Sequence, residues 1–156
     1  MVNRSKNLGT RAETAVVRAA RRLGFPGADR LTLTGSQDRG DVGLCPGVIV
    51  EVKGGDAARR ASDGAIERWL AETERERANA GAAVAFLVVQ RAGVGAPNAH
   101  RWHAFWRHGW ICDLRGYPTE LRDMVTDSSV VRMSLESALA QVRAVGYGSP
   151  LAEAVS

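Results

Sequence analysis

Cysteine and long apolar runs are scarce in this sequence. Its 156 residues hold two cysteines, Cys45 and Cys112, too few for a disulfide framework or a four-cysteine zinc site. We expect both to be reduced packing residues. No apolar run approaches the roughly 20 residues that span a bilayer, and the basic, polar start lacks the apolar stretch of a signal peptide. We therefore expect a cytoplasmic protein with no membrane partner.

Lysine is nearly absent too, because Lys6 and Lys53 are the only lysines among 21 basic residues. The remainder are arginines, whose planar guanidinium group suits phosphate. The net charge of +4 and the isoelectric point near 9.7 favour a polyanionic partner. Gly93-Val94-Gly95 lacks the lysine and hydroxyl residue of a phosphate loop, so we expect no nucleotide cofactor.

Length and composition are those of one globular domain, with 45% apolar and 24% charged residues. We expect this domain to occupy residues 1–147 and a flexible tail to occupy 148–156. The order of elements predicts an α/β fold in which helices flank a mixed β-sheet. Periodicity predicts helices over 8–23, 63–79 and 135–145, and strands over 30–33, 41–44, 48–53, 82–89, 102–106 and 110–114, the last two as a hairpin.

Two acidic residues and a lysine lie on adjacent predicted strands. Glu51 and Lys53 are two residues apart, so their side chains leave the same face of the strand. Asp41 lies on the preceding strand. Carboxylate oxygens are the ligands that Mg²⁺ prefers, and a bound metal can activate water near a phosphodiester. For Glu51 or Lys53 alone, a salt bridge on an exposed strand would be the simpler interpretation.

The register of the predicted hairpin decides whether this site can form. A two-residue Pro46-Gly47 turn pairs Cys45 with Val48, which places Asp41 opposite Val52 and away from Glu51. A bulge or a three-residue connection would place Asp41 opposite Glu51 instead. The metal site therefore requires an irregularity in the hairpin.

Several further segments accompany this set. Glu13 borders the apolar face of the first helix, within Gly9-Thr10-Arg11-Ala12-Glu13. The other segments are Asp38-Arg39-Gly40-Asp41-Val42, Pro46-Gly47-Val48, Glu51-Val52-Lys53, Asn79-Ala80-Gly81-Ala82 and Leu87-Val88-Val89-Gln90-Arg91. Together these segments resemble the PD-(D/E)xK nuclease superfamily. The nearest likeness is to Holliday-junction resolvase-like proteins of archaea and of actinobacteria and their phages, over about the first two thirds of the chain.

The resemblance implies a restriction-endonuclease-like fold and a bacterial or phage-encoded, Mg²⁺-dependent endonuclease that resolves four-way DNA junctions as a homodimer. Mn²⁺ is expected to substitute for Mg²⁺. Glu13, Asp41 and Glu51 would be catalytic metal ligands together with the Val52 carbonyl, Lys53 would be the catalytic lysine, and Gln90 an accessory residue. Expected DNA contacts come from Arg4, Lys6, Arg11, Arg18, Arg22, Ser36 and Arg39.

Other functions remain open at this point. The same site would suit a restriction-like or repair nuclease, and a non-catalytic DNA-binding module would leave the acidic cluster without use. The spacing of His100, His103, His108 and Cys112 fits no standard zinc site. We expect Trp102, Trp106 and Trp110 to be core or dimer-interface residues, and take the hairpin that carries them as the candidate interface.

Overall fold

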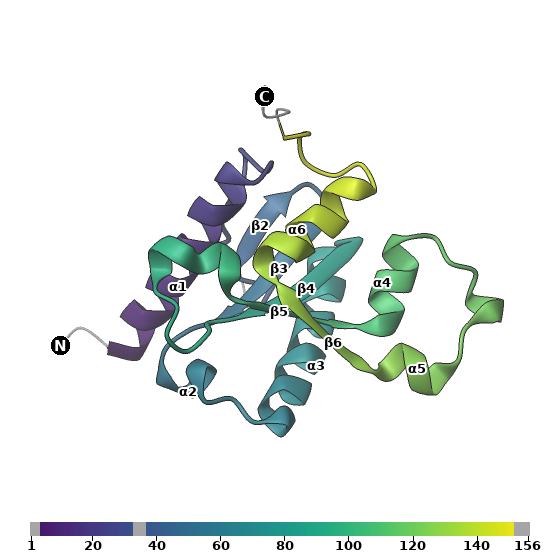
Figure 1. Cartoon of the computed structure of the whole chain (residues 1–156), viewed down its shortest axis with the longest axis horizontal. Coiled ribbons are helices and arrows are strands. Elements are labelled where there is room, and N and C mark those ends of the chain that lie inside the picture. Colours follow the sequence, from purple (N-terminus) through teal and green to yellow (C-terminus); the bar gives the residue numbers. More distant parts are fainter. Residues whose placement is uncertain (1–3, 33–36, 152–156) are drawn as a thin grey trace.

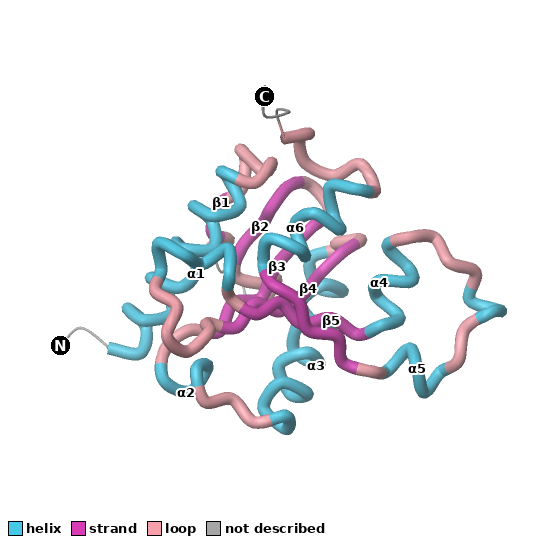
Figure 2. The backbone as a smooth tube through the Cα atoms, viewed as in Figure 1, coloured by secondary structure: helices cyan, strands magenta, loops and turns pink. Residues whose placement is uncertain are grey.

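The computed structural model describes residues 4–32 and 37–151, which form a six-stranded mixed sheet with helices on both faces (Figure 1). The strands lie side by side in chain order and form the magenta layer at the centre of Figure 2. They are β1 (Asp29–Arg30), β2 (Val42–Cys45), β3 (Val48–Lys53), β4 (Val84–Val89), β5 (His103–Arg107) and β6 (Val130–Ser134).

Among the strands of the described residues, only β3 and β4 pair in parallel, and every other neighbouring pair is antiparallel. Parallel strands need a long crossover connection, which here contains α2 (Asp56–Arg59) and α3 (Asp63–Ala80). All six residues of β4 are buried, as its unbroken apolar run predicts. The site residues of β3 therefore lie on a central strand.

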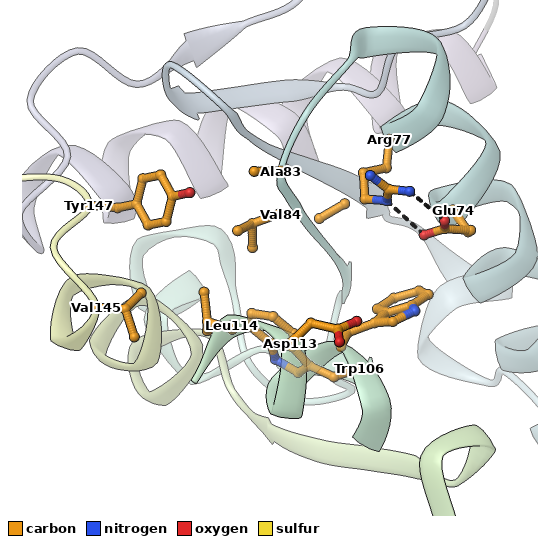
Figure 3. Close-up of a pocket in the computed structure, with 11 residues that line it drawn as sticks. Glu74, Arg77, Ala83, Val84, Trp106, Asp113, Leu114, Val145 and Tyr147 are labelled. Carbon is orange, nitrogen blue, oxygen red and sulfur yellow. Dashed lines mark hydrogen bonds and ion pairs between the residues drawn. The ribbon is translucent and has the colours of Figure 1, made fainter. Parts of the chain in front are cut away.

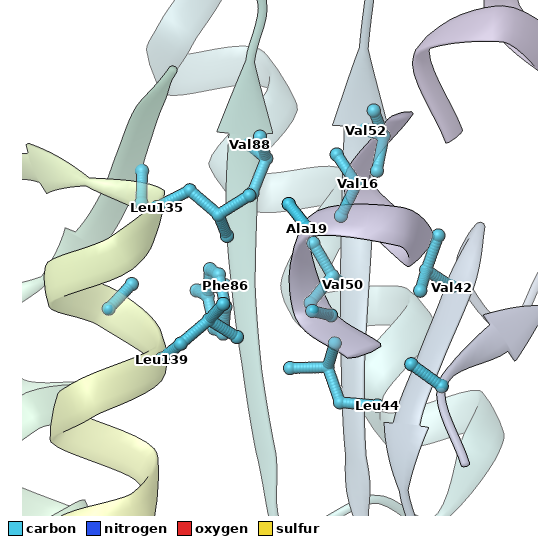
Figure 4. Close-up of a cluster of buried hydrophobic side chains, with 14 of the residues drawn as sticks. Val16, Ala19, Val42, Leu44, Val50, Val52, Phe86, Val88, Leu135 and Leu139 are labelled. Carbon is cyan, nitrogen blue, oxygen red and sulfur yellow. The ribbon is translucent and has the colours of Figure 1, made fainter. Parts of the chain in front are cut away.

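The two faces of β3 contact different helices. Val50 and its even-numbered neighbours lie against α1 (Arg4–Arg22), in a core cluster that also includes residues of β4 and α6 (Leu135–Ala144) (Figure 4). Each such fully buried side chain contributes about 1.5–3 kcal/mol of hydrophobic free energy. The odd-numbered residues point to the opposite face, where Ile66 and Leu70 of α3 pack against the sheet. Glu51 and Lys53 thus belong to the face covered by α3.

The three long helices begin and end within a few residues of their predicted limits. Ser134 caps α6 as expected, because its hydroxyl accepts a hydrogen bond from the Ser137 amide at 3.1 Å. In the part of the chain that the structure describes, none of the helices combines the length and the apolar character that crossing a membrane requires.

The predicted hairpin over 102–114 is wrong in its second half. Residues His108–Leu114 form helix α4. The antiparallel partner of β5 is β6, reached through the 3₁₀ helix η2 (Thr119–Leu121) and α5 (Met124–Ser128). Trp110, Ile111 and Leu114 fit a helical stripe as well as Trp110, Cys112 and Leu114 fit an alternating strand, so local pattern could not decide between them.

Two of the three tryptophans proposed for an interface are core residues. Trp102 and Trp106 have exposed fractions of 1% and 0%, and Trp106 stacks on Phe86 with ring centroids 4.6 Å apart. Their indole rings fill the monomer core and cannot form an intermolecular surface, which overturns that part of the interface hypothesis.

The predicted tail begins with an ordered contact. The Ser149 amide donates a hydrogen bond to the Gly24 carbonyl at 2.7 Å. Residues 152–156 lie outside the described part of the chain. Two short elements, α2 and the 3₁₀ helix η1 (Ala96–Arg101), lie between the predicted helices and strands.

Candidate functional site

A β-bulge supplies the irregularity that the hairpin requires. Cys45 pairs with Val48 across the two-residue turn, yet Gly43 pairs with Ile49 and Val42 with Val50, so Leu44 is the extra residue. Continuing this register places Asp41 beside Glu51. The conditional prediction of a bulge is confirmed, and with it the approach of Asp41 to the acidic residue of β3.

The carboxylates and the lysine form one connected group. Asp41 Oδ2 accepts a hydrogen bond from the Val52 amide at 2.8 Å. Lys53 Nζ lies 2.7 Å from Glu51 Oε1 and 2.9 Å from Glu72 Oε2 of α3. The ammonium group also lies 5.8 Å from the ring centroid of Trp69, a cation–π distance. Two carboxylates and one aromatic ring therefore hold the position of Lys53.

Glu76 is a member of the group that the sequence did not predict. Acidic residues on a highly charged helix such as α3 are usually exposed, but Glu76 and Glu51 are each only 5% exposed. Carboxylate oxygens of Glu51, Glu72 and Glu76 all lie within 4.8 Å of one another. The signal was present in the chain, since Glu76 lies three residues beyond the buried Thr73 and continues the inward stripe of the helix.

Two oxygens of this group lack hydrogen-bond partners. Glu51 Oε2 and Glu76 Oε2 are both buried without one. An unpaired buried polar atom costs roughly 1–3 kcal/mol, and more when it is charged. A divalent cation would satisfy both oxygens, and carboxylates are the hard donors that Mg²⁺ and Mn²⁺ prefer. The donor set therefore fits such a metal.

Burial and mutual repulsion raise the pKa values of these carboxyls. The pKa of Asp41 is raised to about 8 by burial and by the charge of Glu51, and Glu13 adds to the effect. Burial and the adjacent Glu76 carboxyl raise the pKa of Glu51 to about 8 as well. The pKa of Glu76 is also raised, mainly by burial. Closely spaced carboxyls with raised pKa values are typical of functional sites.

The pKa of Lys53 is raised as well, which for an amine favours the charged form. Burial alone would lower its pKa, but the charges and hydrogen bonds of Glu51 and Glu72 outweigh burial and raise the pKa above its usual value. The side chain is therefore a cation at neutral pH. It can neutralise negative charge or orient a water molecule, but it does not accept a proton in this arrangement.

Glu13 lies near the group, but its carboxylate is already engaged. Glu13 Oε2 accepts a hydrogen bond from Arg30 Nε at 2.6 Å, and the Glu13 side chain is 16% exposed. Its charge contributes to the raised pKa of Asp41. Glu13 thus borders the site from α1, whereas Asp41, Glu51 and Lys53 form its centre.

Gln90 lies beside the turn that follows β3. Gln90 Oε1 accepts a hydrogen bond from the backbone amide of Gly55 at 2.9 Å, and the backbone amide of Gln90 donates to the Lys53 carbonyl at 2.9 Å. The residue therefore fixes the turn that follows β3 and, through it, the backbone of Lys53.

The predicted DNA-contacting residues lie on two segments. Arg11, Arg18 and Arg22 have exposed side chains on α1, as has Lys6, and Arg39 is exposed just before Asp41. The side chain of Arg4 and all of Ser36 lie outside the described residues.

A cavity of about 480 Å³ opens at the carboxylates. It is lined by Glu51, Lys53, Glu72 and Glu76 and by Asp38, Arg75, Ala78 and Asn79.

Another cavity, of about 490 Å³, is lined mainly by other side chains of α3, β4, β5 and α4 (Figure 3). Its polar groups include Arg77 and Glu74, which are paired with each other at 2.7 Å. The indole nitrogen of Trp106, which lines this cavity, has no hydrogen-bond partner. Glu74 and Asp113 also line this cavity, but among the described residues neither belongs to a group of three or more potential metal ligands, so the first cavity is the stronger candidate for a metal site. Comparison of the chain with protein-family models, with curated proteins and with solved structures found no match.

Proposed function

We propose that this protein is a Mg²⁺-dependent DNA endonuclease of the PD-(D/E)xK type, with a restriction-endonuclease-like fold, and that it acts on branched DNA. The observation that carries the proposal is the β-bulge in the hairpin of β2 and β3. It brings Asp41, which precedes β2, beside Glu51 of β3, the strand that also bears Lys53. The two unpaired carboxylate oxygens support a cation at this position.

Asp41, Glu51 and the carbonyl of Val52 would hold the metal, with Glu76 and Glu13 beside them. A bound divalent cation stabilises charge on the scissile phosphate and lowers the pKa of coordinated water. The Asp41 carboxylate is oriented by the Val52 amide. The Lys53 cation is held by Glu51 and Glu72, and it neutralises the charge that develops on the phosphate oxygens.

The proposed substrate follows from the exposed basic residues and from the resemblance. Arg11, Arg18 and Arg22 would contact backbone phosphates, which gives affinity that falls steeply as salt is added. Such contacts read shape and charge, not base sequence. A four-way junction is two-fold symmetric and takes two paired cuts, so the proposed active form is a homodimer.

The test compares cleavage of a four-way junction with cleavage of a linear duplex of the same sequence, with Mg²⁺ and with a chelator. We expect Mg²⁺-dependent cuts in the junction and little cleavage of the duplex. Equal cleavage of both substrates would support a nuclease activity but would contradict the proposed specificity for junctions. No cleavage of any DNA with Mg²⁺ or Mn²⁺ would overturn the proposed function.

A further inference from the structure

A second group of metal-ligating side chains lies on the arm of residues 108–129, which projects from the body of the molecule at the right of Figure 1. His108 and Cys112 are one helical turn apart on α4, so they share a face. Asp127 comes from α5. His108 Nδ1 lies 3.6 Å from Cys112 Sγ and 3.8 Å from Asp127 Oδ1, and the three ligand atoms all lie within 4.8 Å of one another.

These separations fit a tetrahedral zinc ion. With metal–ligand distances of about 2.0–2.3 Å, a tetrahedral ion holds its nitrogen, sulfur and oxygen ligands roughly 3.4–3.6 Å apart. The two separations to His108 Nδ1 are within a few tenths of an ångström of that range. The donor set of one imidazole, one thiolate and one carboxylate suits Zn²⁺ better than Mg²⁺.

The Asp127 carboxylate is oriented by a residue that is not a ligand. Arg122 Nη2 lies 2.7 Å from Asp127 Oδ2 and donates a hydrogen bond to the Gly109 carbonyl of α4 at 3.2 Å. A Cβ atom on Gly109 would lie 3.1 Å from Asp127 Cβ, so α4 and α5 approach closely. The second oxygen of Asp127 is left to face His108. Partners that orient ligands in this way are common in metal sites.

The group opens into a cavity of about 500 Å³ whose lining includes His108, Cys112 and Asp127. Three protein donors leave one coordination position for a water molecule or another small ligand from this cavity. The Cys112 thiol is buried, while the His108 side chain is 42% exposed. A metal can therefore enter from the imidazole side.

We propose that His108, Cys112 and Asp127 bind one Zn²⁺ ion that ties α5 to α4. The sequence alone did not suggest this site, because Asp127 lies 15 residues beyond Cys112 and is brought to it by the fold. The other two histidines, His100 and His103, precede α4 and are not part of the group. The proposal does not depend on the nuclease function, since the two donor sets share no residue.

Cobalt substitution tests the site directly. Co²⁺ added to the metal-free protein should produce a thiolate-to-cobalt charge-transfer band that saturates at one equivalent and disappears when Zn²⁺ is added. The carboxylate site of β3 contains no cysteine and cannot give this band. Absence of the band, or its persistence when one equivalent of Zn²⁺ is added, would overturn the proposal.

Matched variants assign the ligands. Cys112→Ser should abolish the band, while Cys45→Ser, which removes the other cysteine, should retain it. His108→Ala and Asp127→Asn should each weaken cobalt binding at least 10-fold. If Cys112→Ser does not fold, these two variants carry the test. Unchanged binding in both, or loss of the band in Cys45→Ser, would show that this group is not the site.

Discussion

At the scale of single residues, Lys53 is the cation on which the proposed chemistry depends. Its ammonium group is fixed by Glu51 and Glu72. Lys53→Ala should lower the cleavage rate by on the order of 10²–10³-fold, the loss typical of a group that stabilises transition-state charge. Junction affinity should change little, because phosphate contacts are spread over many arginines.

The comparison for this variant is Arg101→Ala, which removes one exposed positive charge from η1 and is expected to cleave normally. Single-turnover cleavage and a binding titration in Ca²⁺ separate the two effects. Cleavage by Lys53→Ala at the wild-type rate would refute the role given to the lysine.

Glu76 tests whether the site extends beyond the residues that sequence predicts. Glu76 Oε2 is buried without a hydrogen-bond partner, as Glu51 Oε2 is, and both side chains belong to the same cluster of carboxylates. Glu76→Gln should weaken metal affinity and cleavage by about 10–100-fold, as the loss of a supporting group in a metal site does. Glu74→Gln is the matched control, since Glu74 is paired with Arg77 outside the group. A Mg²⁺ titration reports the outcome, and equal titrations of the two variants would exclude Glu76 from the site.

The raised carboxyl pKa values predict an unusual pH dependence of stability. Asp41 and Glu51 titrate near pH 8 in the folded protein and near pH 4 in the unfolded chain. Between these values the folded state binds more protons, so the free energy of unfolding falls as the pH rises from about 4 to about 8. With chelator present, Tm should therefore be lower at pH 8 than at pH 5.

Asp41→Asn should flatten this fall in Tm, and Mn²⁺ should raise the wild-type Tm more at pH 8 than at pH 5, because protons compete less for the carboxylates at the higher pH. Thermal unfolding followed by circular dichroism measures both. A wild-type Tm that is the same at pH 5 and pH 8, or an equal fall in Asp41→Asn, would argue against the raised pKa values.

At the scale of elements, the approach of α1 to the end of β3 carries Glu13 to the border of the site. A Cβ atom on Gly54 would lie 2.4 Å from the Ala12 Cβ, closer than two such atoms can approach. Gly54→Ala should therefore displace α1, with a loss of about 1–3 kcal/mol in the free energy of unfolding. Cleavage should fall as well, because Glu13 follows Ala12 directly.

Gly27→Ala is the control for this substitution, since a Cβ atom there meets nothing within 4 Å. Chemical denaturation and cleavage assays compare the two variants. If Gly54→Ala is as stable and active as Gly27→Ala, the close packing of α1 on β3 is not what positions Glu13.

The elements also show what local sequence could and could not decide. Strands β3 and β4 were predictable, because alternation and an unbroken apolar run each have one simple interpretation. The bulge at Leu44 followed only as a condition of the metal site. The pairing of β5 with β6 spans the whole arm, and nothing local to Val130–Ser134 specifies it. Glu76 was missed because a carboxylate in an otherwise charged helix indicates solvent exposure by default.

At the scale of the whole molecule, the most exposed large apolar side chains of the described residues lie on the arm. Leu121, Met124 and Val125 have exposed fractions of 84%, 88% and 78%, and adjacent exposed apolar side chains mark interaction surfaces. Since Trp102 and Trp106 are buried in the monomer, the proposed homodimer would use the arm in their place. The symmetry of a four-way junction makes a second copy of this chain the expected partner.

Met124→Asp combined with Val125→Asp should convert this dimer into a folded monomer, because two charges would be buried at the centre of the interface. The monomer should nick a junction in one strand without the paired second cut. Leu151→Asp, which charges an exposed apolar residue outside the arm, should leave both properties unchanged. Light scattering gives the mass, and a supercoiled cruciform plasmid separates nicked from linear product. A double variant that remains dimeric would exclude the arm as the interface. A wild-type protein that is monomeric and still makes both cuts would refute the proposed dimer.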